Sequence, residues 1–231
     1  MDTSQKKKPA VGERTMALKA VPFFTQLTDK ELDVVRAAAT GKTYPKNAVV
    51  LTEGETGDSL YMIQSGKVKV FIGDEEGREI ILKILGPGAF FGEMSMIDKQ
   101  PRSASVTTLE SSTFLVLTHV AFERCVEQVP RIANLVMQVL ATRVREADRK
   151  IGTLALMDVY GRVASTLLEL SVYNDGKLMV GEKLSQQDLA NMVGASREMV
   201  NRILKDLSDR GFISIESKAI TIINRELPPS L

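Results

Sequence analysis

The sequence feature that most constrains the fold is a series of short, β-rich runs between Val49 and Leu117, separated by glycines. Short strands joined by glycine turns are typical of a small antiparallel barrel or jelly roll, an architecture that leaves space for a ligand between its sheets. The sequence therefore predicts an antiparallel β-roll in this region. The predicted strands are Val49–Leu51, Leu60–Ile63, Val68–Ile72, Ile80–Leu82 and Thr113–Leu117.

Helical patterns flank the β-rich region on both sides. Before it, Thr28 and Glu31 have the spacing of a capping box at the start of a short helix. After it, residues 129–157 are predicted to form one helix, far longer than the usual mean of about 11 to 12 residues. A further helix is expected to begin at Val159, with Asp158 as its N-cap, and Asn174–Gly176 is expected to form a turn.

The long predicted helix has a narrow apolar stripe. Its residues are spaced by four, three, four and three positions, which is the pattern of a two-helix coiled coil. Charged residues on either side make the stripe better suited to a helix pair than to a globular core. We predict a symmetric homodimer with this stripe, called the seam below, as its interface; the alternative is that the stripe packs against its own domain. The seam comprises Leu140, Val144, Ala147, Ile151 and Leu154.

The C-terminal region has the pattern of a helix-turn-helix. Ser185 and Asp188 are spaced as an N-terminal capping box, Gly194 suits a tight turn, and Ser196 is placed to cap a second helix. The residues after Gly211 read as a hairpin, the wing of a winged helix. This arrangement predicts a DNA-binding domain.

Four polar residues in the first half of the second helix are predicted to face the DNA groove. Arg197 and Arg202 suit guanine O6 and N7, and Glu198 is able to accept from cytosine N4. Asn201 is expected to read adenine or to bind phosphate. Ser185, at the start of the first helix, is included among the predicted DNA contacts.

A short stretch between two predicted strands contains the groups that a cyclic phosphodiester needs. Gly92 lets the backbone approach an anion closely, and the amides of Glu93 and Met94 are placed to donate to phosphate oxygens. Arg102 is expected to pair with the phosphate, and Ser103 to donate its hydroxyl. Glu93 would repel phosphate, so we expect it to accept from a ribose hydroxyl. The competing interpretation is an ordinary strand end and a solvated turn.

These motifs together resemble the catabolite activator and fumarate-nitrate regulator (CRP/FNR) family of bacterial transcription factors, and the likeness covers nearly everything after residue 20. The resemblance implies an α+β fold with an N-terminal cyclic-nucleotide-binding antiparallel β-roll (jelly roll), a long dimerisation helix and a C-terminal winged helix-turn-helix. The expected organisation is a flexible tail at 1–20, a cyclic-nucleotide-binding sensor domain at 21–128, the dimerisation helix at 129–157 and the winged helix-turn-helix DNA-binding domain at 158–231.

The resemblance also implies a DNA site and a further partner. The recognition helix of the activator class has an Arg-Glu pair followed by a second Arg, matched here by Arg197, Glu198 and Arg202. By analogy, the half-site resembles TGTGA in an inverted repeat. RNA polymerase is the further partner implied, although the connection from Val172 to Lys183 is shorter than in the activator.

This chain departs from the family pattern at the residues expected to contact the base of the ligand. The activator reads the base of cyclic AMP partly with a Thr-Ser pair, and the matching positions here are Ala147 and Asp148. Asp148 is able to accept from adenine N6 or from guanine N1 and N2. With Arg145 and Arg149 nearby, it suits cyclic di-GMP as well; alternatively, Asp148 is only a surface partner of Arg145 or Lys150.

Cyclic AMP is the first expectation for the effector, because the predicted phosphate and ribose contacts serve a monomeric cyclic nucleotide. Cyclic di-GMP is the rival, and a ligand-independent regulator is the third reading. The expected mechanism is allosteric: ligand closes the pocket against the long helix, re-registers the seam and brings the two recognition helices one turn of DNA apart. A cyclic-nucleotide-gated regulator of a protein partner is a remoter alternative, which the helix-turn-helix disfavours.

Composition limits where a DNA-binding surface can lie and which other classes of protein and site are expected. The formal net charge is +1, so any DNA-binding surface must be local. We interpret the single cysteine, Cys125, as a buried helix residue and the single histidine, His119, as a capping or surface residue. We therefore expect neither an enzyme nor a metal site. No apolar stretch approaches the roughly 18 residues of a membrane span, and the polar start is unlike a signal peptide, so a cytoplasmic protein is expected.

Overall fold

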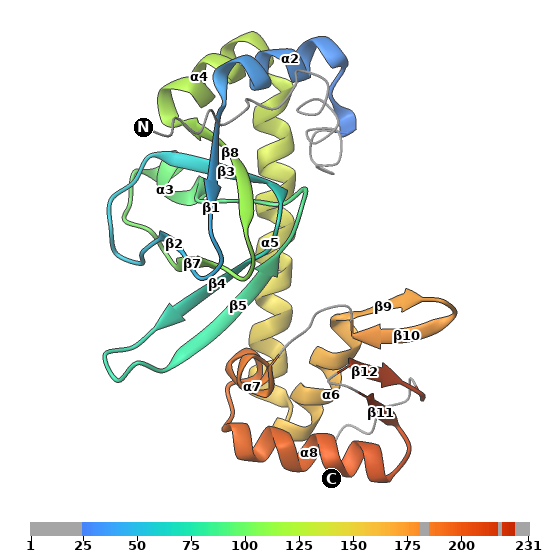
Figure 1. The fold of residues 1–231 in the computed structure, drawn as a ribbon. Coiled ribbons are helices and arrows are strands. Elements are labelled where there is room, and N and C mark those ends of the chain that lie inside the picture. The colour runs from blue at the N-terminus through green and yellow to red at the C-terminus, as the bar shows by residue number, and fades with distance from the viewer. Residues whose placement is uncertain (1–24, 181–184, 217–218, 225–231) are drawn as a thin grey trace, which may run out of the picture. The chain divides into compact units, whose positions relative to one another are not determined.

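The computed structural model describes residues 25–180, 185–216 and 219–224 (Figure 1). The chain divides into two compact units. The first comprises the residues up to 72 together with 82–142, and the second comprises 73–81 together with 143–231. The tail predicted at 1–20 lies outside the described residues.

The first unit is built around the predicted antiparallel β-roll, which consists of two four-stranded sheets (Figure 1). One sheet has the strand order β1 (Thr40–Tyr44), β8 (Ser112–Thr118), β3 (Ser59–Ser65) and β6 (Phe90–Phe91). The other has the order β2 (Val49–Leu51), β7 (Ser105–Thr108), β4 (Val68–Gly73) and β5 (Glu79–Leu85), of which Gly73 and residues 79–81 are assigned to the second unit. All five predicted strands are present within these elements.

The central strands of the first sheet, β3 and β8, are buried on both faces. Side chains alternate along a strand, so Tyr61 and Phe114 face the interior of the roll while Leu60 and Leu117 face the opposite side. Inside the roll, the Tyr61 ring stacks on that of Phe91 with centroids 5.2 Å apart. The fixed register, with Leu60 opposite Leu117, keeps each apolar set on its own face.

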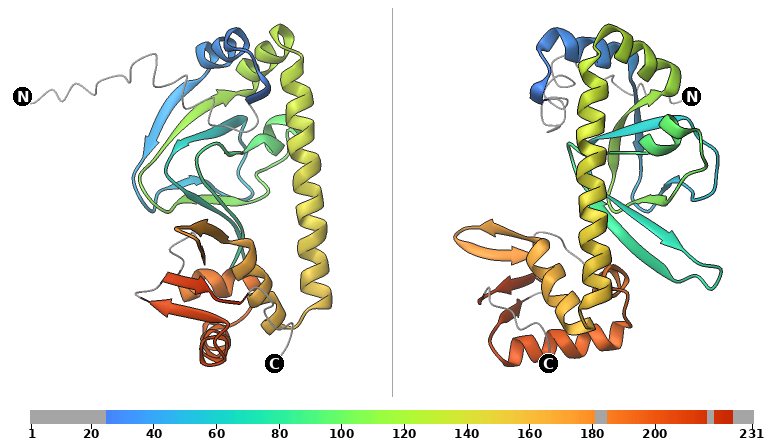
Figure 2. Two further views of the ribbon diagram at one scale, coloured as in Figure 1. Left: turned by 90° about the vertical axis from the view of Figure 1, so that its right-hand side faces the viewer. Right: turned by 180° about the vertical axis from the view of Figure 1, so that it is seen from behind.

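Helices cover the outer face of this sheet (Figures 1 and 2). They are α2 (Asp29–Ala38), α4 (His119–Gln128) and the first part of α5 (Arg131–Leu156). Thr28 and Glu31 form the predicted capping box of α2. Cys125 is buried in α4, where burial raises the pKa of its thiol, and His119 begins α4 with its Nε2 3.1 Å from a Glu123 carboxylate oxygen.

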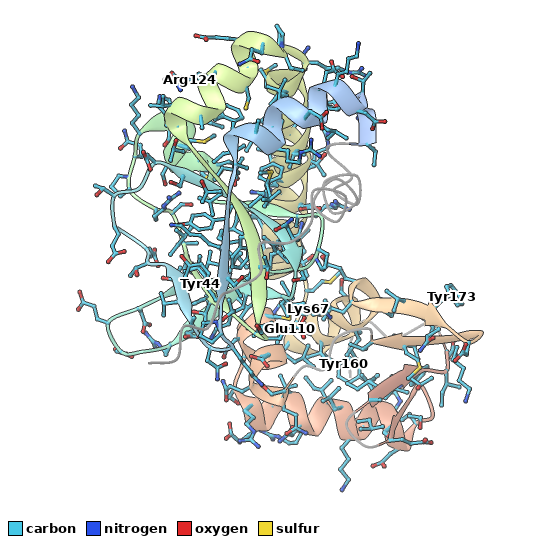
Figure 3. All side chains as sticks on the ribbon, turned by 45° about the horizontal axis from the view of Figure 1, so that its top comes forward. Tyr44, Lys67, Glu110, Arg124, Tyr160 and Tyr173 are labelled. Atoms are coloured by element: carbon cyan, nitrogen blue, oxygen red, sulfur yellow. The ribbon has the colours of Figure 1, made fainter. Side chains whose placement is uncertain are left out.

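The second unit contains the predicted helix-turn-helix. Its helices are α6 (Val159–Glu169), α7 (Gln186–Val193) and α8 (Arg197–Asp209), and Asp158 caps α6 as predicted. They enclose one core to which α8 contributes Val200, Ile203 and Leu207. Tyr160 of α6, labelled in Figure 3, is also buried in this core.

A four-stranded sheet completes the second unit, in the order β11 (Ile213–Glu216), β12 (Ala219–Ile222), β10 (Lys177–Val180) and β9 (Ser171–Asn174). The β11–β12 hairpin is the predicted wing. The β9–β10 hairpin was not predicted beyond its turn, where Asp175 and Gly176 both have positive φ angles, of 48° and 75°. Val172 and Tyr173 are exposed there, so the strand lacks the alternation of a half-buried strand.

Arg162 connects three parts of the second unit. Its Nε donates to the carbonyl of Val193 at the end of α7 (2.8 Å), and its Nη1 donates to the carbonyl of Met157 just after α5 (3.1 Å). These bonds satisfy carbonyls that a helix end leaves unpaired. They fix the start of α6 relative to the helix-turn-helix.

Within the described ranges, no helix is both long and apolar enough to cross a membrane. Among the same residues, no group of three or more His, Cys, Asp or Glu side chains is placed to bind a metal ion.

Candidate functional sites

Arg102 is the centre of the predicted ligand site and is only 6% exposed. Its Nη1 donates to the carbonyl of Gly92 (2.6 Å) and its Nη2 to that of Ser59 (3.0 Å). Its backbone is fixed as well, because its N–H donates to Glu55 (2.8 Å) and its carbonyl accepts from Gly54 (2.9 Å). The guanidinium has more N–H groups than its two carbonyl acceptors use, so it is positioned and still able to donate to an anion.

Two glycines provide the space for this guanidinium. A Cβ added at Gly57 would lie 2.5 Å from Nη2 of Arg102, and one at Gly92 would lie 2.9 Å from Nη1 and 2.8 Å from the Ser59 carbonyl. Gly92 also has a φ of 82°, in the left-handed region that favours glycine. Any larger residue at either position would displace the side chain of Arg102.

A buried carboxylate accompanies the buried cation. Glu93 is the first residue of α3 (Glu93–Asp98) and is 2% exposed. Burial lowers the pKa of the Arg102 guanidinium, while Tyr61, Asp58 and Glu93 raise it. Arginine remains protonated at neutral pH despite such a shift. We call Gly57, Ser59, Gly92, Glu93 and Arg102 the Arg102 cluster.

Two further predicted ligand contacts, Met94 and Ser103, lie at the surface near the start of α3. The Ser103 hydroxyl lies 3.5 Å from the Met94 sulfur, to which it is able to donate a weak hydrogen bond. Met94 is 49% exposed, and Ser103 is exposed too. The structure thus brings the carboxylate, the guanidinium and the hydroxyl to the start of α3. Their role in ligand binding stays a prediction.

The residues predicted to read the ligand base lie on α5 in the second unit. Asp148, Arg145 and Arg149 are all exposed there. Arg149 Nε donates to the carbonyl of Arg145 (3.4 Å), and Lys150 Nζ donates to the carbonyl of Ile81 (3.1 Å). In the described part of the chain Asp148 forms no ion pair, so the alternative of a simple surface pair is not what the structure shows. Base recognition by these residues stays a prediction.

Most of the predicted seam is an exposed apolar face of α5. Leu140 differs, because it is partly buried against the core of the first unit. Met137, seven residues before Val144 and 57% exposed, extends the repeat and was missed. Its position in the heptad pattern was the signal that pointed to it. The exposed members of the predicted seam are Val144, Ala147, Ile151 and Leu154.

The helix-turn-helix has the predicted caps. Ser185 and Asp188 form a capping box on α7, Gly194 ends that helix with a φ of 63°, and the Ser196 hydroxyl accepts from the Met199 N–H at the start of α8. The Ser185 hydroxyl donates to the Asp188 carboxylate (2.7 Å), so it is already engaged within the box. Its predicted contact with DNA is not tested by this geometry.

The exposed face of α8 bears the predicted base-reading residues. Arg197, Glu198 and Arg202 are exposed, and no hydrogen bond or ion pair of their side chains occurs within the described ranges. Lys205 is exposed on the same face, three residues after Arg202, and was missed by the sequence analysis. Its helical spacing from Arg202 was the available signal.

Asn201 is less accessible than the other predicted base-reading residues of α8. Its Oδ1 atom is buried and has no hydrogen-bond partner among the residues described. An asparagine that reads adenine must accept from N6 as well as donate to N7. The side chain would have to rotate before it read adenine in this way, whereas a phosphate contact needs only its amide N–H groups.

Two family models match the chain. Residues 41–129 match the cyclic nucleotide-binding domain, and residues 161–227 match the Crp-like helix-turn-helix domain. The first match includes the Arg102 cluster, and the second includes α7 and α8. The chain therefore has a cyclic nucleotide-binding domain and a Crp-like helix-turn-helix DNA-binding domain.

Comparisons with whole proteins agree with these matches. The chain is 39% identical over 187 residues to the CRP-like cAMP-activated global transcriptional regulator of Mycobacterium tuberculosis, covering 79% of this chain and 84% of that protein. It is 33% identical over 198 residues to the cyclic AMP receptor protein of Thermus thermophilus, covering 86% and 90%. A solved structure of the c-di-GMP responsive global regulator CLP of Xanthomonas campestris matches with a TM-score of 0.75 and 26% identity, covering 85% of this chain and 100% of that one.

Proposed function

Because the chain belongs to the catabolite activator and fumarate-nitrate regulator (CRP/FNR) family of bacterial transcription factors, we propose that it is a homodimeric regulator controlled by cyclic AMP. In this proposal, each chain binds one nucleotide at the Arg102 cluster and one half of an inverted-repeat DNA site with α8. The half-site resembles TGTGA. The regulator acts in the cytoplasm, with RNA polymerase as a further partner.

The observation that best supports a small cyclic phosphodiester is the buried Arg102 guanidinium beside the buried Glu93 carboxylate. Burying charge is unfavourable unless partners compensate it, so such a pair at a glycine-lined turn indicates a functional role. Arg102 would pair with the phosphate, Ser103 would donate to it, and Glu93 would accept from the ribose hydroxyl. All three groups are then used by one nucleotide of ordinary size.

The exposed apolar face of α5 supports the homodimer. Val144 and Ile151 are 60% and 64% exposed, and Met137 precedes Val144 by one heptad. Apolar residues at this spacing on a charged helix are typical of a two-stranded coiled coil. We propose Met137 as a member of the interface in addition to the predicted seam.

Binding at the sensor would control DNA affinity by selecting the dimer in which both recognition helices match successive major grooves. A ligand shifts such an equilibrium only as far as its affinities for the two states differ. Arg102 is fixed to β3 and α3 through the carbonyls of Ser59 and Gly92, so movement of a bound phosphate is transmitted to these elements.

Cyclic di-GMP is the second candidate effector. Asp148, with no ion pair in the described part of the chain, lies on α5 close in sequence to Arg145 and Arg149. This combination suits a guanine better than an adenine, because an arginine pairs with guanine O6 and N7 while a carboxylate accepts from N1 and N2. The solved relative from Xanthomonas campestris is named as responsive to c-di-GMP.

Calorimetric titration of the purified dimer with cyclic AMP, cyclic GMP and cyclic di-GMP tests the proposal. We expect one cyclic AMP to bind per chain. Ser103→Ala should weaken the affinity for cyclic AMP at least about tenfold, and Asp148→Ala should change the preference among the three nucleotides. Preference for cyclic di-GMP, lost in Asp148→Ala and unaffected in Ser103→Ala, would place the effector site on α5 instead. DNA binding that ignores all three nucleotides would refute cyclic-nucleotide control and leave the DNA-binding assignment intact.

A further inference from the structure

A polar cluster in the second unit is used by none of the roles proposed so far. The Tyr160 hydroxyl of α6 donates to the Asp206 carboxylate of α8 at 2.8 Å. Arg210, just beyond α8, has its Nη1 3.2 Å from the same carboxylate oxygen and 3.3 Å from the Tyr160 hydroxyl. The Arg210 guanidinium also lies over the Phe212 ring, 5.1 Å from its centroid. We call Tyr160, Asp206 and Arg210 the Asp206 cluster.

Asp206 has two arginines at helical pairing distance in sequence. Arg202 is four residues before it and Arg210 four residues after it, and both spacings bring side chains together on a helix. In the structure Asp206 pairs with Arg210, while Arg202 is exposed and has no partner among the described residues. The observed pair has the acidic residue on the N-terminal side, which is the more favourable orientation.

Tyr160 makes this choice of partner stronger than helix spacing alone. Its side chain is 2% exposed, so its hydroxyl must find an acceptor inside the protein or remain buried without one. Asp206 is the acceptor that the structure provides. Burial and the nearby carboxylate raise the pKa of Tyr160 to about 12, so the hydroxyl keeps its proton at physiological pH.

A carboxylate paired with Arg202 would oppose DNA recognition in two ways. It would occupy the N–H groups that a bidentate contact with guanine requires, and it would place a negative charge beside the DNA phosphates. Arg202 therefore depends on Asp206 having other partners. Two groups provide these partners: Tyr160, which is buried on α6, and Arg210, which lies beyond the C-terminal end of α8.

We propose that Tyr160 and Arg210 are positioning residues that hold the Asp206 carboxylate away from Arg202 and so keep this arginine available to read DNA. The inference rests on the proposed contact between Arg202 and a base. In this proposal, Tyr160 and Arg210 affect DNA recognition through Asp206 and not through a contact of their own with a base. Their effect is on specific binding, since non-specific affinity depends on many phosphate contacts.

The test uses the full chain with saturating cyclic AMP and a DNA duplex selected by the wild-type protein from a random pool, with a scrambled duplex measured in parallel. Tyr160→Phe removes only the hydroxyl. We expect specific binding, measured by fluorescence anisotropy, to weaken about tenfold, which is within the range for loss of one bidentate base contact. Binding to the scrambled duplex should change by less than about twofold.

Rescue separates the proposed role from a merely structural one. In Tyr160→Phe/Asp206→Asn, the neutral amide cannot form an ion pair with Arg202, so specific binding should return to within about twofold of the wild type. Arg210→Gln should weaken specific binding in the same way and should also be rescued by Asp206→Asn. A loss that persists in both double variants, or no loss in either single variant, would overturn the proposal.

A parallel measurement distinguishes this proposal from the one on which it rests. Arg202→Ala should weaken specific DNA binding. Adding Tyr160→Phe to this variant should not weaken specific binding further. If Arg202→Ala leaves specific binding intact, the base contact itself is wrong and the proposed positioning role is overturned with it. If Arg202→Ala weakens binding while the Tyr160 and Arg210 variants do not, only the positioning role is overturned.

Discussion

The two units place the charged residues of their proposed sites in opposite environments. In the first, Arg102 and Glu93 are almost completely buried, and Arg102 is anchored to the carbonyls of Gly92 and Ser59. In the second, Arg197 and Arg202 are exposed, with no partner among the residues described.

The two ligands that we propose would account for this difference. A single cyclic phosphodiester offers one charge, so a site that binds it gains from being rigid and dry before the ligand arrives. Duplex DNA offers a negative charge about every 1.7 Å along its axis, so attraction is plentiful and the task is to reach a particular base edge. The buried charges are therefore expected to be coupled to stability, and the exposed ones to be nearly independent of it.

The largest effect should come from Arg102→Ala, which leaves the Glu93 carboxylate buried without its neighbouring cation. Removal of one partner from a buried pair typically destabilises a protein by about 3–5 kcal/mol, and we expect a loss of that order in urea unfolding together with loss of measurable cyclic AMP binding. Arg102→Lys, which retains the charge, should recover much of the stability and little of the affinity. If Arg102→Ala left the free energy of unfolding unchanged, the buried Arg102 charge would make no net contribution to the stability of the fold.

Ile151→Asp extends the comparison to exposed apolar groups. If the apolar face of α5 is covered in a dimer, a carboxylate there should raise the dimer dissociation constant at least about a hundredfold, because an unpaired charge would be buried. Sedimentation velocity at micromolar protein measures this. Thr142→Asp, an exposed position of α5 outside the seam, is the matched control and should remain dimeric.

Arg202→Ala should weaken binding to the preferred DNA site by about 1 to 3 kcal/mol, relax the preference at one base pair and leave urea unfolding unchanged. Lys205→Ala provides the contrast on the same face of α8. We expect Lys205→Ala to weaken binding to all DNA sequences equally. It should also reduce the slope of log K against log salt concentration by about one, as loss of a phosphate contact does. A uniform loss in Arg202→Ala would reassign that residue to the phosphate backbone.

Gly57→Ala tests the rigidity of the buried site without removing any charge. The added methyl group would overlap the Arg102 guanidinium and force it off the Ser59 and Gly92 carbonyls. We expect cyclic AMP affinity to fall about tenfold, which corresponds to one displaced charge-assisted hydrogen bond. Gly41→Ala, where nothing lies within 4 Å of the added atom, should bind as the wild type does.

The smallest effect that we expect is a pH dependence of the stability of the second unit. The pKa of Tyr160 is raised to about 12, above the value near 10 of an exposed tyrosine. The neutral phenol therefore stabilises the fold fully below about pH 10, and this contribution is lost as the pH rises through about 12. The stability difference between the wild type and Tyr160→Phe, from urea unfolding, should shrink over this interval. A constant difference would show that the hydroxyl is not a titrating group in the fold.

Local patterns were sufficient to predict much of this molecule. The capping boxes at Thr28 and Ser185, the turn at Gly194 and the long helix depend on residues close in sequence, and the structure confirms them. The wing and the β-roll were also predicted, because apolar runs and glycines mark them.

What the sequence analysis missed depends on contacts between distant residues. The role of Gly57 arises only because Arg102, far along the chain, folds against it. The strands β1 and β7 are polar segments that pair with long apolar neighbours, so their own residues contain little strand signal. The burial of the Asn201 Oδ1 atom and the pairing of Tyr160 with Asp206 likewise follow from helix packing rather than from spacing.

The strand that anchors Arg102 has a further consequence for how slowly the site changes shape. β3 is paired with β8 on one side and β6 on the other, and its two faces contribute to separate apolar cores. Backbone amides in such a strand exchange with deuterium only through large-scale opening. Ser59, whose carbonyl accepts from Arg102, is the first residue of that strand. The Arg102 cluster is thus attached to a strand that we expect to open only on global unfolding, and the geometry of the cluster should persist on that time scale.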